Sequence, residues 1–459
     1  MAMKPNQIRR RDLLKAAGLV LAIDGSTANA APGRGDAARA GEVFPRAWSV
    51  KSVDKPTLGE TNPDFQRFSG ADIFQIYRPL KNERDGKGAW EAEQAAKAKR
   101  TAEWIQKGLP GLSLRDRQLS AGAGTVNHSA KAGEGLLSWT RISVKTLAEL
   151  GVPPYTATPQ EAALTVKAAA RFYGAGLAGI APMNEAHINR KQGGREGKEG
   201  LEISIEDVDV PSVTAEKFVI PRKMKWVVAI AIPMDLDLLR RVPTALGEAA
   251  VSLGYSDSAF VVASLAEFIR GLGYQAIPCV NDTAPSIPFA VDAGLGELSR
   301  LNKMVSPEFG AGLRICKVFT DLPMACDKPI DSGIVEFCKR CKKCAEACPA
   351  RALSFDAEPS FKVRGPWNNP GHKAWFEDSY KCYQYWQQVG SGCGICIASC
   401  PFTKAAGGWV HDTVETTVSI TPVADRFFRV MDDVFGYGKQ PRDLEQWWTK
   451  ARPASTRRD

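Results

Sequence analysis

The chain has 459 residues, 44% of them hydrophobic and 24% charged, which is the composition of a globular protein of two or three domains. Its net charge of +9 is scattered, with no aromatic-interleaved basic stripe, so nucleic acid is a poor candidate partner. No stretch reaches the roughly 18 apolar residues of a membrane span. All eleven cysteines follow residue 278, which excludes the evenly spread disulfide framework of small secreted proteins.

Residues 1–30 are predicted to be an export signal, not part of the fold. A basic start leads into a short apolar run, and Ala28-Asn29-Ala30 resembles a cleavage site. Arg10-Arg11 followed by Asp12-Leu13-Leu14-Lys15 resembles a twin-arginine signal. The alternative is a basic amphipathic start to a chain that is not exported. A twin-arginine route carries proteins already folded, which suits a cofactor inserted in the cytoplasm.

The next three hundred residues predict a helical N-terminal region followed by an α/β domain. Thr158-Pro159 predicts a helix start, and Gly174 a helix end before a short buried strand. Helices then alternate with apolar strands, which indicates an α/β domain over 150–330. Within it, 184–222 is polar and rich in Gly and charge, so we expect a loop-heavy insertion there. The elements expected in this region are helices at 90–108 and 161–173, strands at 177–181 and 225–234, and a helix, a Gly break and a strand within 258–280.

Two cysteine motifs follow. "CKRCKKCAEACP" has the C-x2-C-x2-C-x3-C-P spacing of bacterial ferredoxins, and "CYQYWQQVGSGCGICIASCP" repeats it with a gap of ten residues. In such tandem modules the fourth Cys of each motif ligates the other cluster. The alternative is that these cysteines bind zinc. The predicted ligand sets are Cys338, Cys341, Cys344 and Cys400 for the first 4Fe–4S cluster, and Cys382, Cys393, Cys396 and Cys348 for the second.

The ten-residue gap carries the aromatic residues Tyr383, Tyr385 and Trp386 on an expected loop. They either pack locally or form the wall of an apolar pocket beside the cluster. Three cysteines lie outside the motifs, Cys279, Cys316 and Cys326, and are expected to be small buried residues.

The chain resembles the corrinoid-dependent reductive dehalogenases of anaerobic respiration. The resemblance runs from the leader to the end and is densest from Trp226 to Gly438. It is carried by "FIRGLGYQAIPCVND", "FAVDAGLGELSRLNKMVSPEFGAGLRICKVFTDLP", "KPIDSGIVEFCKRCKKCAEACP" and "CPFTKAAGGWVHD". The chain lacks the D-x-H-x-x-G motif that ligates cobalt in many other corrinoid proteins. Family members hold their cobamide base-off, without a protein ligand below the cobalt.

The resemblance implies roles for individual residues. Tyr255 matches the family's proton donor, Arg314 its neighbouring arginine, and Asn281 a residue of the same pocket. Trp386 matches a tryptophan that reaches the substrate cavity in the subset with the ten-residue gap, and Phe74 is a candidate wall aromatic. Four residues match corrinoid-contacting loops: Gly294, Gly296, Ser299 and Phe309. Without the resemblance, Tyr255 would be read as a helix-start surface residue, Arg314 as a strand-end ion pair and Asn281 as a turn residue.

The implied fold is a nitroreductase-like α/β (α+β) corrinoid domain carrying a ferredoxin-like module. The expected divisions are a signal at 1–30, a region covering the substrate cavity at 31–149, the corrinoid domain at 150–330, the cluster module at 331–408 and a returning segment at 409–459. Two 4Fe–4S clusters and one cobamide, of cobalamin or norpseudo type, are the expected cofactors.

The expected function is reductive removal of halide from an organohalide, on the outer face of the cytoplasmic membrane. A small membrane-anchor protein and a quinone-linked electron donor are the implied partners, and a homodimer is one arrangement left open. Two alternatives remain. A corrinoid and iron–sulfur reductase of an epoxide in tRNA would lack a leader, and a pure electron carrier would not need the long α/β domain.

Overall fold

The computed structural model describes residues 44, 50–73, 88–193, 200–403 and 443–449. These residues belong to one unit, 43–459. The predicted export signal, Phe74 and most of the segment at 409–459 lie outside the described residues.

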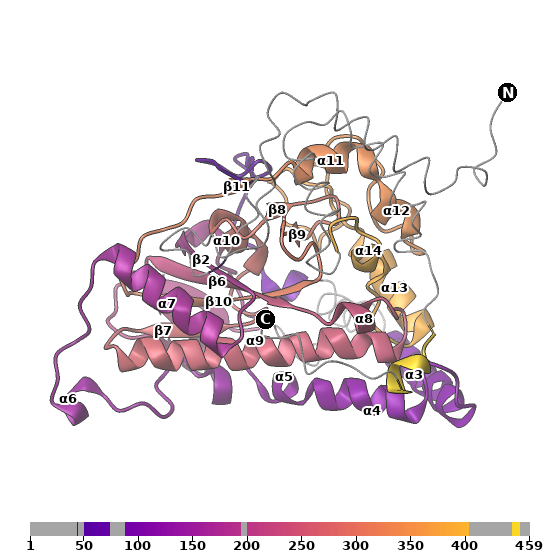
Figure 1. Ribbon diagram of the computed structural model, residues 1–459, viewed down its shortest axis with the longest axis horizontal. Helices are drawn as coiled ribbons and strands as arrows, with labels where there is room; N and C mark the ends of the chain where they lie inside the picture. The colour runs from indigo at the N-terminus through magenta and orange to yellow at the C-terminus, as the bar shows by residue number, and fades with distance from the viewer. Residues whose placement is uncertain (1–43, 45–49, 74–87, 194–199, 404–442, 450–459) are drawn as a thin grey trace, which may run out of the picture. The chain divides into compact units, whose positions relative to one another are not determined.

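A four-stranded antiparallel sheet in the order β2-β6-β10-β7 is the centre of the fold (Figure 1). Its strands are β2 (Leu177–Pro182), β6 (Trp226–Pro233), β7 (Ala276–Cys279) and β10 (Leu313–Thr320). Six consecutive residues of β6 are buried, because helices cover both faces of the sheet. The strands expected at 177–181, 225–234 and within 258–280 are therefore confirmed. The alternation of helices and strands does not produce a parallel sheet here, since every pair in this sheet is antiparallel.

Helix α9 (Ala245–Gly271) packs along one face of the sheet, and α10 (Ser286–Asp292) covers the other (Figure 1). α7 (Pro159–Tyr173) contacts both β2 and α9. It begins as expected, because Thr158 and Glu161 form a reciprocal capping box and Pro159 occupies the first turn. α4 (Leu114–Ala123) and α5 (Thr125–Ser129) lie against α9.

α9 is also long and apolar enough to cross a membrane by length and composition. The sequence expectation that no stretch qualifies is thus wrong by this criterion. The helix is nevertheless the central core helix of the described residues, with 61% of its most apolar window buried. A buried core helix meets the same criterion, so the composition of α9 is explained by packing against the sheet.

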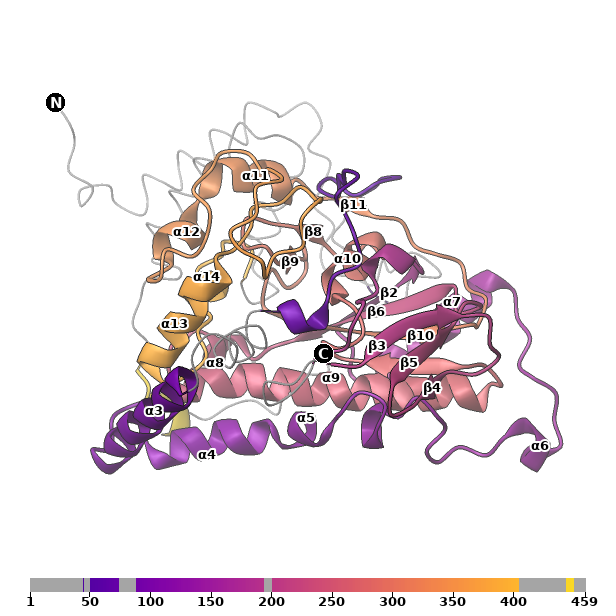
Figure 2. The same cartoon turned by 180° about the vertical axis from the view of Figure 1, so that it is seen from behind.

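The expected loop-heavy insertion at 184–222 is wrong for its second half. Residues 202–221 form a three-stranded sheet in the order β3-β5-β4, in which β3 and β5 are parallel (Figure 2). Ile203, Phe218 and Ile220 enter the same hydrophobic cluster as the main sheet. The strands were missed because each is short and the segment that contains them is rich in charged residues. They are β3 (Glu202–Glu206), β4 (Ser212–Val213) and β5 (Lys217–Pro221).

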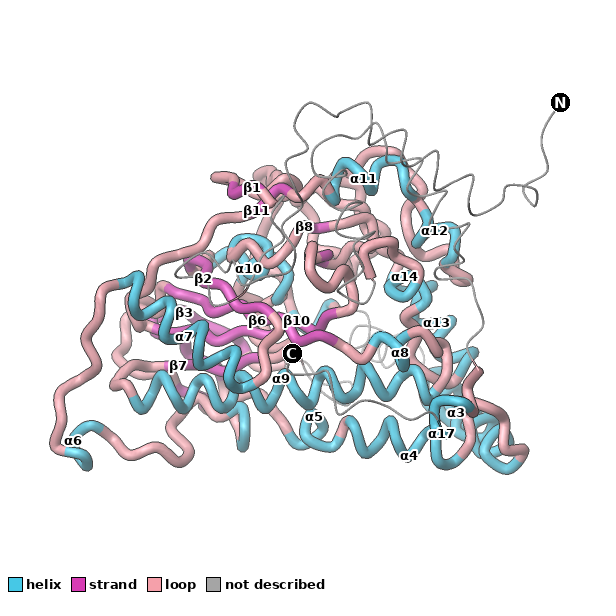
Figure 3. Tube along the Cα trace, viewed as in Figure 1, coloured by secondary structure: helices cyan, strands magenta, loops and turns pink. Residues whose placement is uncertain are grey.

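The cysteine-rich part of the chain is built from short helices and loops (Figure 3). Phe337 and Phe402, one from each motif, meet edge to face at 5.2 Å. The N-terminal helix α3 (Ala89–Gln106) packs against this part: Arg100 donates to the Gln387 carbonyl at 2.8 Å, and Trp90 stacks on Tyr383. The helices are α11 (Ile334–Cys341), α12 (Lys343–Ala347), α13 (Ser379–Val389) and α14 (Ile395–Ala398).

The remaining elements are short. The strands are β1 (Lys51–Ser52), which pairs with β11 (Ile330–Asp331), and β8 (Glu297–Leu298), which pairs with β9 (Met304–Val305). The helices are α6 (Leu147–Leu150), α8 (Leu236–Leu239), α17 (Gln446–Thr449), η1 (Gly70–Asp72), η2 (Gly135–Leu137) and η3 (Glu185–His187).

Replacing Gly310 with Ala is expected to destabilise the fold by at least about 2 kcal/mol. Gly310 has a φ of +59°, and an added Cβ would lie 2.2 Å from the Phe402 carbonyl oxygen, where the chain before β10 meets the end of the second motif. Gly108 is a matched control, because its φ is +60° and an added Cβ would touch nothing. Denaturant unfolding measures both variants. Equal losses of unfolding free energy in the two variants would mean that the strain of the positive φ, and not the clash with Phe402, causes the destabilisation at Gly310.

Candidate functional site

Tyr255, Arg314 and Asn281 converge on the Tyr255 hydroxyl. The Asn281 amide nitrogen lies 3.0 Å from this oxygen, and Arg314 Nη1 lies 3.1 Å from it. The guanidinium also lies over the Tyr255 ring, 4.8 Å from its centroid. We call these three residues the Tyr255 centre. They are 26 and 59 positions apart in the chain, so only the tertiary fold brings them together.

The elements of the core position each member of this centre. Tyr255 lies in the third turn of α9, half-buried, and not at a helix start. The preceding Gly254 makes room for Arg314, since a Cβ there would lie 2.9 Å from the Arg314 Cγ. Arg314 is the second residue of β10, and its Nε also reaches the Met234 sulfur at 3.2 Å. Asn281 follows β7 and is exposed.

The surroundings of the Tyr255 hydroxyl lower its pKa from the ordinary value of 10. Burial alone raises the pKa. The Arg314 charge, the hydrogen bonds from Asn281 and Arg314, and the Lys303 charge together outweigh burial and favour the phenolate. The centre can therefore stabilise the anion that is left when Tyr255 gives up its proton.

Lys317 is a supporting residue that the sequence analysis missed. It is fully buried, and its Nζ donates to the carbonyls of Val280 and Asp282 and to the Ser286 hydroxyl, at 3.3, 3.0 and 3.1 Å. It thereby fixes the turn that presents Asn281. Burial lowers the pKa of Lys317 and raises that of Asp282, whose carboxylate has no hydrogen-bond partner among the described residues. The available signal was a lysine inside the apolar strand sequence "RICKVFT".

The cysteines form two groups drawn from both motifs. Cys338, Cys341, Cys344 and Cys400 line one cavity, together with Ser299 and Arg300. Burial raises the pKa of the Cys344 thiol, and the charges of the three other cysteines of this cavity, and of Cys396 from the second group, raise it further. The fourth cysteine of the second motif therefore lies with the first three of the first motif, as the crossed ligand pattern requires.

The second group shows the reciprocal arrangement. Burial raises the pKa of Cys396 to about 12, and the charges of Cys393 and Cys348 act on it in the same direction. Burial likewise raises the pKa of Cys382, with contributions from Cys396 and Cys393. No disulfide joins any of the eleven cysteines. Within the part of the chain that the structure describes, no three His, Cys, Asp or Glu side chains form the compact geometry of a single-ion site.

Other predicted residues lie elsewhere or differ from expectation. Trp386 lies on helix α13 and not on a loop, its ring contacts Tyr383 at 5.9 Å, and its buried indole N–H lacks a partner in the described part of the chain. Cys279 and Cys316 are buried as expected, but Cys326 is exposed, which corrects that prediction.

The four predicted corrinoid contacts lie around β8 and β9. Gly294, Gly296 and Ser299 are buried, and Phe309 is half-buried. Gly294 has a φ of +70° in the turn that ends α10, and a Cβ on Gly296 would lie 2.3 Å from the Val305 carbonyl oxygen. The turn therefore explains the first glycine, and the tight approach of β8 to β9 explains the second. Their contact with a corrinoid stays a prediction.

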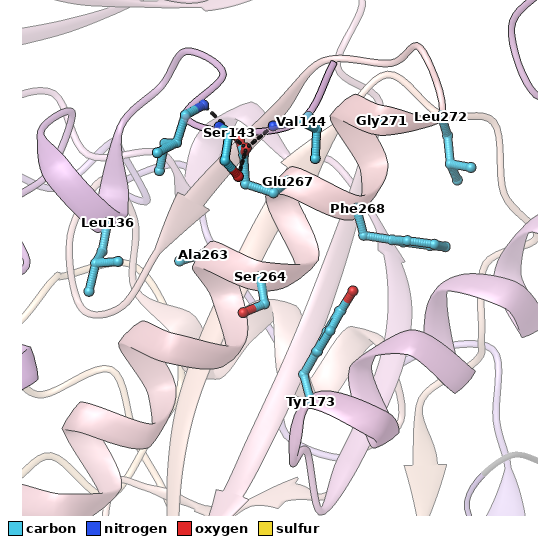
Figure 4. Close-up of a pocket in the computed structure, with 11 residues that line it drawn as sticks. Leu136, Ser143, Val144, Tyr173, Ala263, Ser264, Glu267, Phe268, Gly271 and Leu272 are labelled. Atoms are coloured by element: carbon cyan, nitrogen blue, oxygen red, sulfur yellow. Dashed lines mark hydrogen bonds between the residues drawn. The ribbon is translucent and has the colours of Figure 1, made fainter. Parts of the chain in front are cut away.

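A groove of about 540 Å³ lies apart from these residues, along the C-terminal half of α9 (Figure 4). Its walls are mostly apolar and include Leu136, Tyr173 and Phe268. The Glu267 carboxylate at its rim accepts hydrogen bonds from the backbone N–H groups of residues 142–144. It contains no residue of the Tyr255 centre and no cysteine, so the chemistry indicated by those groups lies elsewhere.

Comparison with known proteins identifies both halves of this arrangement. Residues 337–403 match the family model of a 4Fe-4S double cluster binding domain, and residues 201–324 match that of a reductive dehalogenase subunit. The tetrachloroethene reductive dehalogenase of Sulfurospirillum multivorans is 38% identical over 306 residues, covering 64% of this chain and 60% of the relative. The chain thus carries a reductive dehalogenase subunit domain followed by a 4Fe-4S double cluster domain.

Other family members extend the likeness. A tetrachloroethene reductive dehalogenase of Desulfitobacterium hafniense strain Y51 is 35% identical over 328 residues, covering 66% of this chain and 59% of the relative. A solved reductive dehalogenase structure, described as suggesting a mechanism for B12-dependent dehalogenation, superposes with a TM-score of 0.62 at 22% identity, over 87% of this chain and 50% of that one. This confirms the predicted fold class. The chain aligns with about three fifths of the length of these curated relatives.

Proposed function

We propose that this protein removes halide from an organohalide by two-electron reduction, at the cobalt of a bound corrinoid that receives electrons through two 4Fe–4S clusters. The observation that carries the proposal is the Tyr255 centre, a proton-holding tyrosine oxygen with two converging donors, in a chain that also holds two cysteine groups. The named activities of the family members support the same reaction class. The overall change is R–X + 2e⁻ + H⁺ → R–H + X⁻.

A corrinoid would be held by the β8–β9 region, near both the cysteines and Tyr255. The β8–β9 region carries Lys303, whose charge acts on Tyr255, while Cys396 and Cys382 act on Lys303. The β8–β9 region therefore lies within electrostatic range of Tyr255 and of the cysteines of the second group. Gly294, Gly296, Ser299 and Phe309 are the residues that would hold the group. When bound, a corrinoid supplies a cobalt ion able to pass an electron pair to a carbon–halogen bond.

The protein's own residues would handle the proton and the charge. Tyr255 would donate its hydroxyl proton to the carbon that loses halide. Arg314 and Asn281 would stabilise the remaining phenolate, since both already reach its oxygen. Arg314 would also attract the negative charge that develops on the departing halide. Trp386 and Phe74 are proposed to line the substrate cavity.

The first thirty residues and the family resemblance support a proposal for the setting of this reaction. We propose export by the twin-arginine route and attachment to the outer face of the cytoplasmic membrane through a small integral-membrane anchor protein. A quinone-linked membrane donor would supply the electrons. The wider proposal is that the protein is the terminal reductase of organohalide respiration.

The test is an anaerobic assay with a reduced viologen dye and a panel of aliphatic, alkenyl and aromatic organohalides. The proposal predicts two electrons consumed and one halide released per turnover with at least one substrate class. Electron uptake by the clusters without halide release from any compound would favour an electron carrier. Activity only on an epoxide-modified tRNA would favour the epoxide-reductase alternative.

Turnover is expected to decline on the alkaline side at a pH below 10. The reaction needs protonated Tyr255, whose pKa is lowered, so activity is full below that pKa and is lost as pH rises through it. Asn281→Ala removes a hydrogen bond that favours the phenolate, so its alkaline limb should move to higher pH. The pH dependence of kcat measures this shift. A limb that moves downward, or stays fixed, in Asn281→Ala would contradict the assignment of that limb to Tyr255.

A further inference from the structure

The turn between β8 and β9, residues 299–303, carries two cations in fixed positions. The backbone N–H and the hydroxyl of Ser299 both donate to the Lys303 carbonyl, at 3.0 and 2.8 Å. Asn302 adopts a φ of +53°, which asparagine tolerates better than most residues. The turn is therefore closed on itself, and it projects Arg300 and Lys303 from a rigid base.

Arg300 is buried, with an exposed fraction of 1%. Its Nε and Nη2 donate to the Cys338 carbonyl at 2.9 and 2.7 Å, and its Nη1 donates to the carbonyls of Ser354 and Asp356 at 2.9 and 2.6 Å. The guanidinium lies over the Trp375 ring at 4.7 Å. Through these hydrogen bonds, the guanidinium links the turn of the first motif to the segment at 354–356.

The charge of Arg300 lacks a carboxylate partner within ion-pair distance among the described residues. A buried cation without an anion is costly, so a nearby negative charge is required. Arg300 lines the same cavity as all four cysteines of the first group.

We propose that Arg300 is the built-in counter-cation of the cluster held by Cys338, Cys341, Cys344 and Cys400, and that it raises the reduction potential of this cluster. A 4Fe–4S cluster with four thiolates gains one negative charge on reduction, and its potential depends on net charge and hydrogen bonding around it. A fixed cation stabilises the reduced form more than the oxidised form. The proposal depends on the cluster assignment and not on the organohalide reaction.

Lys303 provides an internal contrast at the second group. Its Nζ forms an ion pair with Glu377, so this cation is neutralised locally. A cation paired with a carboxylate offsets less of the negative charge of a reduced cluster, so the second cluster is expected to be harder to reduce than the first.

The experiment is a redox titration of the purified full chain, with each cluster followed by its electron paramagnetic resonance signal. Arg300→Gln should lower the potential of one cluster by enough to change its reduction equilibrium at least tenfold, which is about 59 mV for one electron. Arg300→Lys keeps the charge and should retain most of the potential. Glu377→Gln is the matched control and should raise the potential of the other cluster.

Iron content separates redox tuning from loss of the cluster. If Arg300→Gln keeps about eight iron atoms per chain and both potentials stay at the wild-type values, the proposal is overturned. If that variant does not keep its iron, the comparison uses Glu377→Gln in an otherwise unchanged chain. Glu377→Gln should leave the reduction potential of one cluster unchanged, and that cluster must be the more easily reduced of the two in the wild type. The reverse order would overturn the proposal.

Discussion

Tyr255→Phe is expected to reduce organohalide turnover by at least about 100-fold, which is the lower range of the contribution of a positioned proton donor. The variant loses only the hydroxyl that Asn281 and Arg314 reach at 3.0 and 3.1 Å. The ring remains, so the Arg314 guanidinium keeps its position over it. Cofactor content should stay at the wild-type level. Steady-state kinetics with a reduced dye, together with iron and cobalt analysis, measures both quantities.

Tyr274→Phe is the matched control for this substitution. The Tyr274 hydroxyl also makes a hydrogen bond, to the Tyr155 carbonyl at 2.8 Å, and it lies outside the Tyr255 centre. We expect this variant to keep normal turnover. Near-normal turnover in Tyr255→Phe, with full cofactor content, would rule out Tyr255 as the proton donor.

Cys400→Ala is expected to halve the iron content, from about eight to about four atoms per chain, and to abolish turnover. The cluster that is lost should be that of the first motif, although Cys400 belongs to the second. The reason is spatial: Cys400 lines the cavity that contains Cys338, Cys341 and Cys344. Iron analysis gives the loss, and electron paramagnetic resonance of the reduced protein identifies the surviving cluster.

Two further substitutions serve as controls for this prediction. Cys396→Ala should remove the other cluster, so its surviving signal should differ from that of Cys400→Ala. Cys326 is exposed and lies outside both motifs, so Cys326→Ala should keep both clusters. Identical surviving signals in Cys400→Ala and Cys396→Ala would mean that both residues serve one cluster, which contradicts the crossed pattern.

Sequence reasoning succeeded where local signals and packing agree. Thr158, Glu161 and Gly174 mark the ends of α7 through capping, and the continuous apolar run of β6 fits a strand buried on both faces. It failed for β3 and β5, whose parallel pairing joins residues 15 positions apart, as in Glu202 with Lys217. Short strands with few apolar residues give too weak a pattern for this.

The candidate site was predictable to a different degree in each part. The cysteine spacing alone predicts two groups, because three ligands of each group come from one local motif. The Tyr255 centre came from the family resemblance, since no local pattern connects a helix residue, a turn residue and a strand residue. Arg300 and Lys317 were missed because a lone cation in an apolar segment does not reveal which buried group it meets. The insert carrying Trp386 was expected to be a loop, yet its first residues continue helix α13.

The central claim is that one chain combines a corrinoid with two iron–sulfur clusters, and metal content tests it most directly. The chain would be purified without oxygen from a host supplied with cobamide, and cobalt and iron would be measured per polypeptide. About one cobalt and about eight iron atoms are the result that this account predicts. About eight iron atoms without cobalt, from cells shown to contain cobamide, would contradict it and leave the Tyr255 centre without a catalytic role.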